Sequence, residues 1–234
     1  MIIHSDHSIF GITEKEKIDI LVNPANTVGV MGAGLALEFK LRYPEYYAEY
    51  HRKALQNQFK IGELYLFQEK DFQIATLFTK KHWKYPSKLE WIKAGFDAIN
   101  NYLEDKQKLT IAMPLAGAGK GGLSKEEVIF EIERSFKKTP SKVYICHDKI
   151  SSEHEKTALN KIYKTTPEKI SNQALAHIVK IAQEDQKPHR FRDLQKIKGI
   201  GKTAYQKLFL AFMKPKKTAK KDEEKGEQKT LFYQ

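Results

Sequence analysis

Apolar runs rich in β-branched residues alternate with segments of helical spacing along the first 150 residues. Residues 18–22 form such a run and end at the turn signal Asn23-Pro24, which indicates a buried strand. Residues 34–43 combine Leu, Ala, Glu and Lys and stop before Pro44, which favours a helix although apolar positions alternate. The same reasoning predicts further strands at 63–68, 73–79, 109–113 and 142–146, and helices at 87–103 and 125–137. Strands separated by helices imply an α/β fold with a mixed or parallel sheet, which binds ligands where loops leave the carboxyl ends of its strands.

The length and charge of the chain suggest one main domain with a basic appendage. Of 234 residues, 41% are hydrophobic, which suffices for one full core. We assign residues 1–150 to the main domain, 151–166 to a linker, 167–213 to a small helical region and 214–234 to a disordered basic tail. Lys and Arg number 22 against 19 Asp and Glu in residues 1–150, and 19 against 10 in the remainder. The surplus positive charge therefore lies in the C-terminal third, which indicates either a polyanionic partner or a solubilising tail.

The location of the protein is expected to be cytoplasmic, with no membrane partner. Neither a run of about 18 apolar residues nor the charged and apolar regions of a signal peptide occurs. The single cysteine, Cys146, lies in an apolar run and is interpreted as a buried small hydrophobe rather than a nucleophile.

Two glycine-rich loops, 22–34 and 114–123, each lie between a predicted strand and a predicted helix. Glycine lets backbone N–H groups approach an anion closely, and a following helix supplies a favourable dipole for phosphate. Two such loops suit a diphosphate held from both sides. Neither loop has the Walker pattern or the dinucleotide fingerprint, so the usual nucleotide-binding folds are disfavoured.

Both loops resemble those of macrodomains, which bind ADP-ribose with a three-layer α/β/α fold and a mixed sheet. Val22-Asn23-Pro24-Ala25-Asn26 with residues 29–36 is similar to the first macrodomain loop, and residues 113–123 are similar to the second. Residues 78–84 and Lys88-Leu89-Glu90 resemble the DarG branch, whose members are antitoxins that strip ADP-ribose from DNA bases modified by a DarT-type toxin. The resemblance implies ligand contacts by Asp6, Asn26, Val28, Gly29, Val30, Met31, Gly32, Gly34, Thr79, Pro114, Leu115, Ala116, Gly117, Ala118, Gly119, Lys120 and Gly121.

The DarG resemblance also assigns catalysis to Lys80. Lys80 and Lys81 point to opposite faces of a strand, so only one readily faces the ligand. A lysine with an ordinary pKa is protonated at neutral pH, so attack as a free amine requires desolvation or a cationic neighbour such as Lys81 or Lys84. A protonated Lys80 would act instead by polarising the scissile bond or stabilising the leaving group. A related macrodomain branch has a catalytic aspartate where this chain has Gly121, which argues against a carboxylate-assisted mechanism.

Several other predicted site residues have a structural alternative. Asn26 is the candidate for hydrogen-bonding the ribose beside the scissile bond, or it only shapes the loop as an Asx-turn residue. Asp6 is the candidate for accepting a hydrogen bond from the adenine amino group, and the alternative is that it is a turn residue at a strand end. His82 and Trp83 contact nucleic acid by stacking on a nucleobase, or they are a solvent-facing ring and a core ring, respectively.

The C-terminal third contains two further motifs. Residues 167–183 predict an amphipathic helix, and residues 194–208 resemble a helix-hairpin-helix, which holds DNA phosphates without reading bases. Lys198, Gly199, Gly201 and Lys202 are its predicted nucleic-acid contacts, although Tyr205 stands where a small residue is usual and a plain helical pair is the alternative. Gln228, Leu231 and Phe232 resemble the peptide with which bacterial proteins dock on the sliding clamp. The alternatives are a chance match and packing of the tail onto the host domain.

The expected function is an ADP-ribosyl glycohydrolase that acts on modified nucleic acid, with water as acceptor and neither metal nor cofactor. The alternatives are an ADP-ribose-binding module without turnover and a phosphatase for ADP-ribose 1″-phosphate. Expected partners are ADP-ribosylated DNA and a DarT-type toxin.

Overall fold

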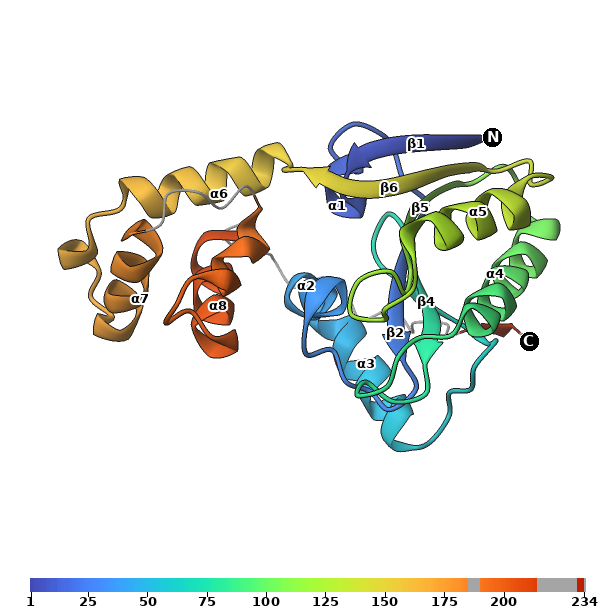
Figure 1. Cartoon of the computed structure of the whole chain (residues 1–234), viewed down its shortest axis with the longest axis horizontal. Coiled ribbons are helices and arrows are strands. Elements are labelled where there is room, and N and C mark those ends of the chain that lie inside the picture. Colours follow the sequence, from blue (N-terminus) through green and yellow to red (C-terminus); the bar gives the residue numbers. More distant parts are fainter. Residues whose placement is uncertain (185–189, 214–230, 234) are drawn as a thin grey trace. The chain divides into compact units, whose positions relative to one another are not determined.

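A computed structural model describes residues 1–184, 190–213 and 231–233 (Figure 1). These residues belong to two compact units. The first contains residues 1–149 and the C-terminal residues 231–233, and the second contains the described residues between 150 and 213.

The first unit carries all the strands and helices predicted for residues 1–150. In chain order it contains β1 (Ile2–His7), α1 (Ile9–Ile12), β2 (Ile20–Asn26), α2 (Gly34–Arg42), α3 (Pro44–Leu55), β3 (Leu64–Gln68), β4 (Gln73–Lys80), α4 (Leu89–Glu104), β5 (Thr110–Pro114), α5 (Lys125–Phe136), β6 (Lys142–Ile150) and β7 (Leu231–Tyr233). Helices α1 and α3 were not predicted. Pro44 ends α2 as expected, but its fixed φ also suits the first position of the next helix.

One mixed sheet forms the middle layer of the first unit. Its strand order is β1-β6-β5-β2-β4-β3-β7. Strand β2 pairs in parallel with both β4 and β5, β5 pairs in parallel with β6, and β3 is antiparallel to β4. A register irregularity between Ala25 and Asn26 brings Asn26 opposite Lys80. The ends of β2 and β4 are therefore side by side at the edge where the first loop begins.

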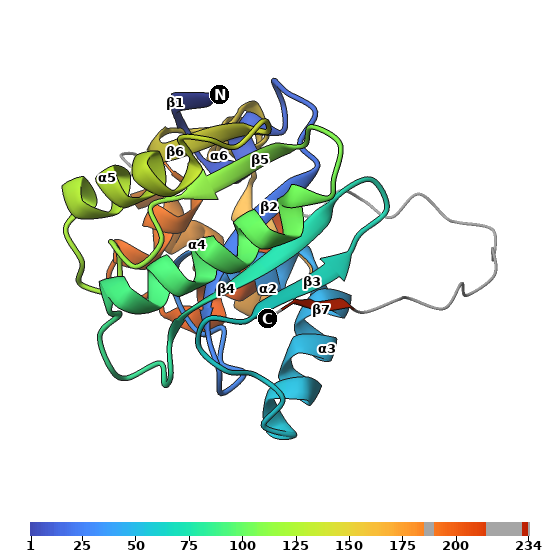
Figure 2. The ribbon, with the colours of Figure 1, turned by 90° about the vertical axis from the view of Figure 1, so that its right-hand side faces the viewer.

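Helices cover both faces of this sheet (Figure 2). On one face, apolar side chains of α4 and α5 such as Phe96 and Ile132 pack against Val22 and Leu77. On the other face, α1, α2 and α3 form a second core that is rich in aromatic side chains, including Phe10, Phe39, Tyr46, Tyr50 and Phe78. The predicted three-layer α/β/α fold is confirmed.

The second unit is helical, and it begins earlier than expected. It contains α6 (Glu153–Lys164), η1 (Pro167–Lys169), α7 (Gln173–Glu184), η2 (Phe191–Lys196), α8 (Lys202–Leu208) and the π-helical segment η3 (Phe209–Met213). Residues 151–166, expected as a linker, instead contain α6, which buries Ala158, Leu159 and Ile162. The single helix expected at 167–183 is interrupted, since η1 ends at Lys169 and α7 starts at Gln173.

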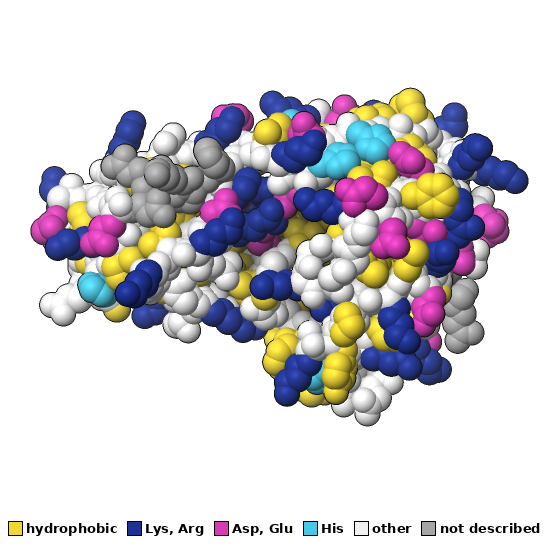
Figure 3. Space-filling view, viewed as in Figure 1, with side chains coloured by type: hydrophobic (Ala, Val, Ile, Leu, Met, Phe, Trp, Pro, Cys, Tyr) yellow, Lys and Arg dark blue, Asp and Glu magenta, His cyan; other side chains and the backbone are white. Residues whose placement is uncertain are grey.

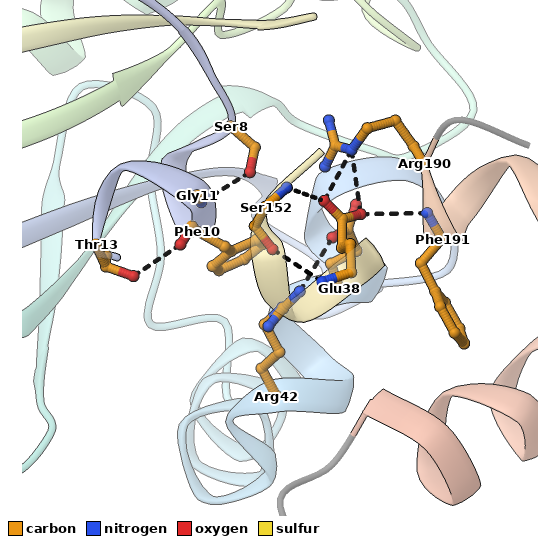
Figure 4. A network of polar contacts seen from close by, with 10 residues as sticks. Ser8, Phe10, Gly11, Thr13, Glu38, Arg42, Ser152, Arg190 and Phe191 are labelled. Carbon is orange, nitrogen blue, oxygen red and sulfur yellow. Dashed lines mark hydrogen bonds and ion pairs between the residues drawn. The ribbon is translucent and has the colours of Figure 1, made fainter. Parts of the chain in front are cut away.

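A buried carboxylate joins α6 to η2 within the second unit (Figure 4). Arg190 Nε donates to both Glu155 carboxylate oxygens, at 3.1 and 2.9 Å, and the Phe191 N–H donates to Oε1 at 3.2 Å. Glu155 and the hydroxyl of Ser152 also cap the first turn of α6 reciprocally. Glu155 and Arg190 are both almost fully buried. Removing either partner would leave a buried charge uncompensated, so the pair ties these elements together.

The predicted disordered tail, 214–234, falls outside the described residues except at 231–233. These three residues form β7, whose backbone pairs with β3 in antiparallel register. Gln228 of the predicted clamp-docking peptide lies outside the described residues, and Leu231 and Phe232 belong to β7.

Cys146 is buried on β6, and burial raises the pKa of its thiol to about 12, so the thiol is protonated and unreactive as expected. Within the described ranges, no helix is both long enough and apolar enough to cross a membrane.

Candidate functional site

The first glycine-rich loop is shaped by the side chain of Asn26. Its amide nitrogen donates to the Val30 carbonyl oxygen at 2.6 Å. Its amide oxygen accepts from the N–H groups of Val28 and Val30, both at 3.2 Å. The side chain is almost fully buried. The structure thus shows Asn26 in the loop-shaping role that the sequence left open as the alternative.

Helix α3 holds the same loop from outside. The Tyr50 hydroxyl donates to the Asn26 carbonyl oxygen, and His51 Nδ1 lies 3.0 Å from the Gly29 carbonyl oxygen. Gly29 has a φ of +80°, and a Cβ there would lie 2.9 Å from the Cβ of Ala54. Only glycine suits this position, because both the backbone conformation and the contact with α3 exclude a side chain.

The part of the first loop that precedes α2 is suited to bind an anion through its backbone. In the described part of the chain, the N–H groups of Gly32 and Gly34 donate no hydrogen bond, and α2 begins directly after them without a side-chain cap. Uncapped N–H groups and the helix dipole favour phosphate. Met31 does not contribute its side chain, because that side chain is buried in the aromatic core.

The second loop is closed by its own glycines. A Cβ on Gly121 would lie 2.2 Å from the Gly117 carbonyl oxygen and 2.4 Å from Ser87 Oγ. Position 121 therefore has no room for a side chain, so an aspartate at this place does not fit. This steric limit gives a physical reason for the departure from the carboxylate-bearing branch that the sequence showed.

The backbone of the second loop is open to a ligand. A Cβ on Gly119 would meet no atom within 4 Å. Within the described residues, the N–H groups of Gly117, Gly119 and Lys120 donate no hydrogen bond. Pro114, Ala116 and Thr79 are buried and therefore have only their backbone to offer, while Leu115 and Ala118 pack against the core.

Lys80 lies between the two loops. Its carbonyl oxygen accepts from the N–H of Thr27, in the first loop, at 3.1 Å. Its Nζ donates to the Lys120 carbonyl oxygen of the second loop at 2.6 Å. The side chain is half-buried, and desolvation lowers the pKa of its ammonium group. Of the two causes that the sequence offered for a lowered pKa, desolvation by burial is the one that acts here.

The loop between β4 and α4 is tied to both glycine-rich loops. Near its start, Thr27 Oγ1 donates to the Lys81 carbonyl oxygen at 2.8 Å. At its end, the Ser87 N–H donates to the Gly121 carbonyl oxygen at 2.9 Å. His82 and Trp83 lie between these anchors, and Trp83 is exposed rather than part of the core. The predicted nucleic-acid contacts, His82 and Trp83, thus lie on an anchored loop that begins directly after Lys80.

Asp6 belongs to β1, where it is exposed and forms an ion pair with Lys149 at 2.9 Å. The hydrogen bond from Lys149 lowers the pKa of its carboxyl group. Asp6 is therefore an ionised acceptor, as contact with an adenine amino group requires, although Lys149 competes for it. No contact joins Asp6 to Lys80 or the glycine-rich loops in the described structure.

The predicted phosphate contacts of the C-terminal third lie in the second unit. Gly199 has a φ of +94° in the turn between η2 and α8, and Lys198, Gly201 and Lys202 are exposed around it. Tyr205 is buried against Phe191 and Phe209. Its ring is part of the small core of this unit, which explains a bulky residue at this position. Figure 3 shows Lys and Arg side chains over the helices of the second unit.

Sequence reasoning missed the residues that position the loops, namely Thr27, Tyr50, His51 and Ser87. The hydrogen-bonded partners of Tyr50, His51 and Ser87 are more than 20 residues away in the chain. No local pattern marks such pairs. Across the described ranges, no group of three or more His, Cys, Asp or Glu side chains is arranged to hold a metal ion.

Known proteins resemble the part of this chain that carries the two glycine-rich loops. The family model described as Macro domain matches residues 22–130. The solved macrodomain of Mycobacterium tuberculosis DarG is 32% identical, with a TM-score of 0.57, and the alignment covers 97% of that structure and 62% of this chain. The chain belongs to the macrodomain family. Its macrodomain contains both glycine-rich loops and Lys80.

Two curated relatives add information on function. A DNA ADP-ribosyl glycohydrolase of Mycobacterium tuberculosis is 36% identical over 126 residues, which cover 52% of this chain and 36% of the relative. A DNA ADP-ribosyl transferase-DNA ADP-ribosyl glycohydrolase fusion protein of Thermosipho africanus is 30% identical and is covered over 32% of its length. The chain thus spans about a third of the length of these relatives.

Proposed function

We propose that this macrodomain hydrolyses the glycosidic bond between ADP-ribose and a base of modified nucleic acid. The observation that carries the proposal is the position of Lys80, whose backbone contacts the first loop and whose Nζ contacts the second. A group held between the two loops through its diphosphate would place its distal ribose near this ammonium group. The similarity to DNA ADP-ribosyl glycohydrolases supports the same reaction.

In the proposed reaction, the bond from the anomeric carbon of the distal ribose to the base breaks, and water supplies the new oxygen on that carbon. The electron pair of the broken bond goes to the base, which takes up a proton. Because the pKa of Lys80 is lowered only by partial burial, we assign it the ammonium form at neutral pH. Its charge then stabilises the leaving base, in preference to attack as a free amine.

Three substrates separate this function from its alternatives. The protein is incubated with ADP-ribosylated DNA, an ADP-ribosylated peptide and ADP-ribose 1″-phosphate, and free ADP-ribose is measured. Release from DNA alone is expected. Binding of ADP-ribose without turnover would indicate a binding module, and release of inorganic phosphate would indicate a phosphatase.

The enzyme that attaches the group is a natural partner of this activity. The Thermosipho africanus relative joins a DNA ADP-ribosyl transferase to a glycohydrolase in one chain. We propose that this chain reverses the product of a DarT-type transferase. Co-expression with such a toxin should restore growth with the intact chain and not with Lys80→Ala.

The second unit is proposed to hold DNA phosphates through Lys198, Gly199, Gly201 and Lys202. These residues are exposed around the η2–α8 turn. Affinity for unmodified DNA should fall steeply with salt. The slope of log affinity against log salt concentration should be on the order of −0.9 for each duplex phosphate that is contacted. Lys198→Glu combined with Lys202→Glu should flatten that slope, and an unchanged slope would exclude this surface. Docking of the terminal peptide on a sliding clamp stays a prediction, because Gln228 lies outside the described residues.

A further inference from the structure

The loop between β4 and α4 presents three aromatic rings next to one another, His82, Trp83 and Tyr85, which we call the ring stack. The His82 ring centroid lies 5.5 Å from that of Trp83 at an interplanar angle of 27°, and 5.6 Å from that of Tyr85 at 52°. Trp83 is 49% exposed and Tyr85 is 64% exposed. The Trp83 and Tyr85 rings therefore leave much of their surface to solvent instead of packing in the core.

Positive charge surrounds the ring stack. Residues 80–88 contain four lysines and no acidic residue. Lys84 Nζ lies 5.4 Å from the centroid of the Trp83 ring. Farther along, Lys88 Nζ is 5.1 Å from the Trp91 ring and 3.5 Å from Glu90, which partly neutralises it. Exposed rings interleaved with cations are the arrangement that binds bases by stacking and the backbone of a nucleic acid by charge.

The ring stack is held in place beside Lys80. The loop that carries it is anchored to Thr27 of the first glycine-rich loop and to Gly121 of the second. The Lys84 N–H also donates to His82 Nδ1 at 3.3 Å. Trp83 is three residues beyond Lys80, a path of at most about 10 Å. A base stacked on these rings would thus lie close to a ribose held beside Lys80. The base itself would stay outside the space between the two loops.

We propose that the ring stack is a subsite for an unpaired nucleobase next to the modified nucleotide, with Lys84 facing the intervening phosphate. The inference rests on the proposed function and adds Tyr85 to its binding residues. Stacking accepts every base, because each has a π-face, but it requires that face to be open. An ADP-ribosylated protein segment offers neither a regular series of planar rings nor a polyanionic backbone, so the exposed rings and lysines favour nucleic acid.

Binding of an unmodified strand tests the subsite without any turnover. The single-stranded heptanucleotide (dT)7 is titrated into the full chain, and tryptophan fluorescence is recorded. Stacking on Trp83 should quench the emission, and Tyr85→Ala, which keeps Trp83 as the reporter, should weaken binding about tenfold. Phe130→Ala is the matched control, since Phe130 is 65% exposed on α5, outside the β4–α4 loop. Equal affinity of the intact chain and the Tyr85→Ala variant would overturn the proposal.

Hydrolysis then separates the subsite from the proposed function. Free ADP-ribose is measured from an ADP-ribosylated mononucleotide and from a heptanucleotide modified at its central base. Tyr85→Ala should lower the ratio of kcat/KM for the heptanucleotide to that for the mononucleotide about tenfold, and Phe130→Ala should leave the ratio unchanged. If the intact chain releases ADP-ribose from neither substrate, the proposed function fails. If the intact chain hydrolyses both substrates and Tyr85→Ala keeps the ratio, the inference fails. It also fails if Tyr85→Ala lowers kcat/KM for an ADP-ribosylated peptide as much as for the heptanucleotide.

Discussion

Both glycine-rich loops are bonded to residues at the end of β4, but otherwise they are held by different parts of the chain. The first loop is held by a side chain of its own, Asn26, and by Tyr50 and His51 of α3. The second is held by the end of β4 and the loop that follows it. Lys80 Nζ contacts the Lys120 carbonyl oxygen, and the Ser87 N–H contacts the Gly121 carbonyl oxygen.

This difference assigns different roles to the loops. In the described structure the first loop bonds to the backbone of Lys80 and not to its side chain, so its shape does not depend on the ammonium group, as a cradle for the ligand should. The second is bonded to that lysine directly, so its position and that of the Lys80 ammonium group depend on each other. Substitutions in the first loop should therefore affect binding, and those around the second should affect turnover as well.

Loss of the Lys80 side chain should have the largest effect. Lys80→Ala should lower kcat by about 10²- to 10³-fold, as expected for removal of a charge that stabilises the transition state, and leave ADP-ribose affinity within about tenfold. Calorimetry and a release assay measure the two effects. Lys70→Ala, an exposed lysine just before β4, is the control and should be fully active. Full activity of Lys80→Ala would refute the assignment.

The pH dependence shows which form of Lys80 acts. Since desolvation lowers its pKa, an ammonium role predicts activity that is present below this lowered pKa and lost as pH rises through it. The loss should come at a lower pH than for an ordinary lysine. An amine nucleophile predicts the opposite, with activity that rises through the same pH. Lys80→Arg should retain part of the activity only if charge is what matters.

Gly121 and Gly119 offer the next comparison, within the second loop. Gly121→Ala forces a Cβ to within 2.2 Å of a backbone oxygen, so the loop must shift. We expect a loss of about 1 to 3 kcal/mol in the free energy of unfolding and a fall in kcat, because Lys120 moves with its neighbour. Gly119→Ala meets nothing within 4 Å and should keep the melting temperature. An unchanged melting temperature of Gly121→Ala would show that the loop adapts freely.

The first loop should respond in binding more than in turnover. Asn26→Ala leaves the Val30 carbonyl oxygen and two N–H groups without their partner, so the loop should lose its shape and ADP-ribose affinity should fall about tenfold. The bound substrate should still react at a similar kcat. Asn100→Ala is the matched control, because the Asn100 amide donates to the Ser135 carbonyl oxygen far along the chain from both loops. A larger loss in kcat than in affinity would show that Asn26 acts in the reaction itself.

The sequence predicted the parts of this architecture that depend on local pattern. Strand β2 and both glycine-rich loops follow from the apolar pattern and turn residues, and helix α2 follows from its helix-forming composition and the stop before Pro44. Helix α6 was taken for a linker because its residues are mostly polar, although Ser152 and Glu155 have the spacing of a capping box that marks a helix start. The contacts of Lys80 with Lys120 and of Ser87 with Gly121 join segments more than 30 residues apart, so only the folded chain reveals them.

Ser87 should give the smallest effect and thereby show how the second loop is held. The Ser87 side chain is buried, and its Oγ has no hydrogen-bond partner in the described structure, whereas its backbone N–H contacts Gly121. Ser87→Ala removes only the unpartnered oxygen, so the free energy of unfolding should change by less than about 0.5 kcal/mol or rise slightly. Denaturant unfolding and the release assay check this. A large loss of activity at unchanged stability would mean that the hydroxyl contacts the substrate, and the second loop would then be more than a backbone cradle.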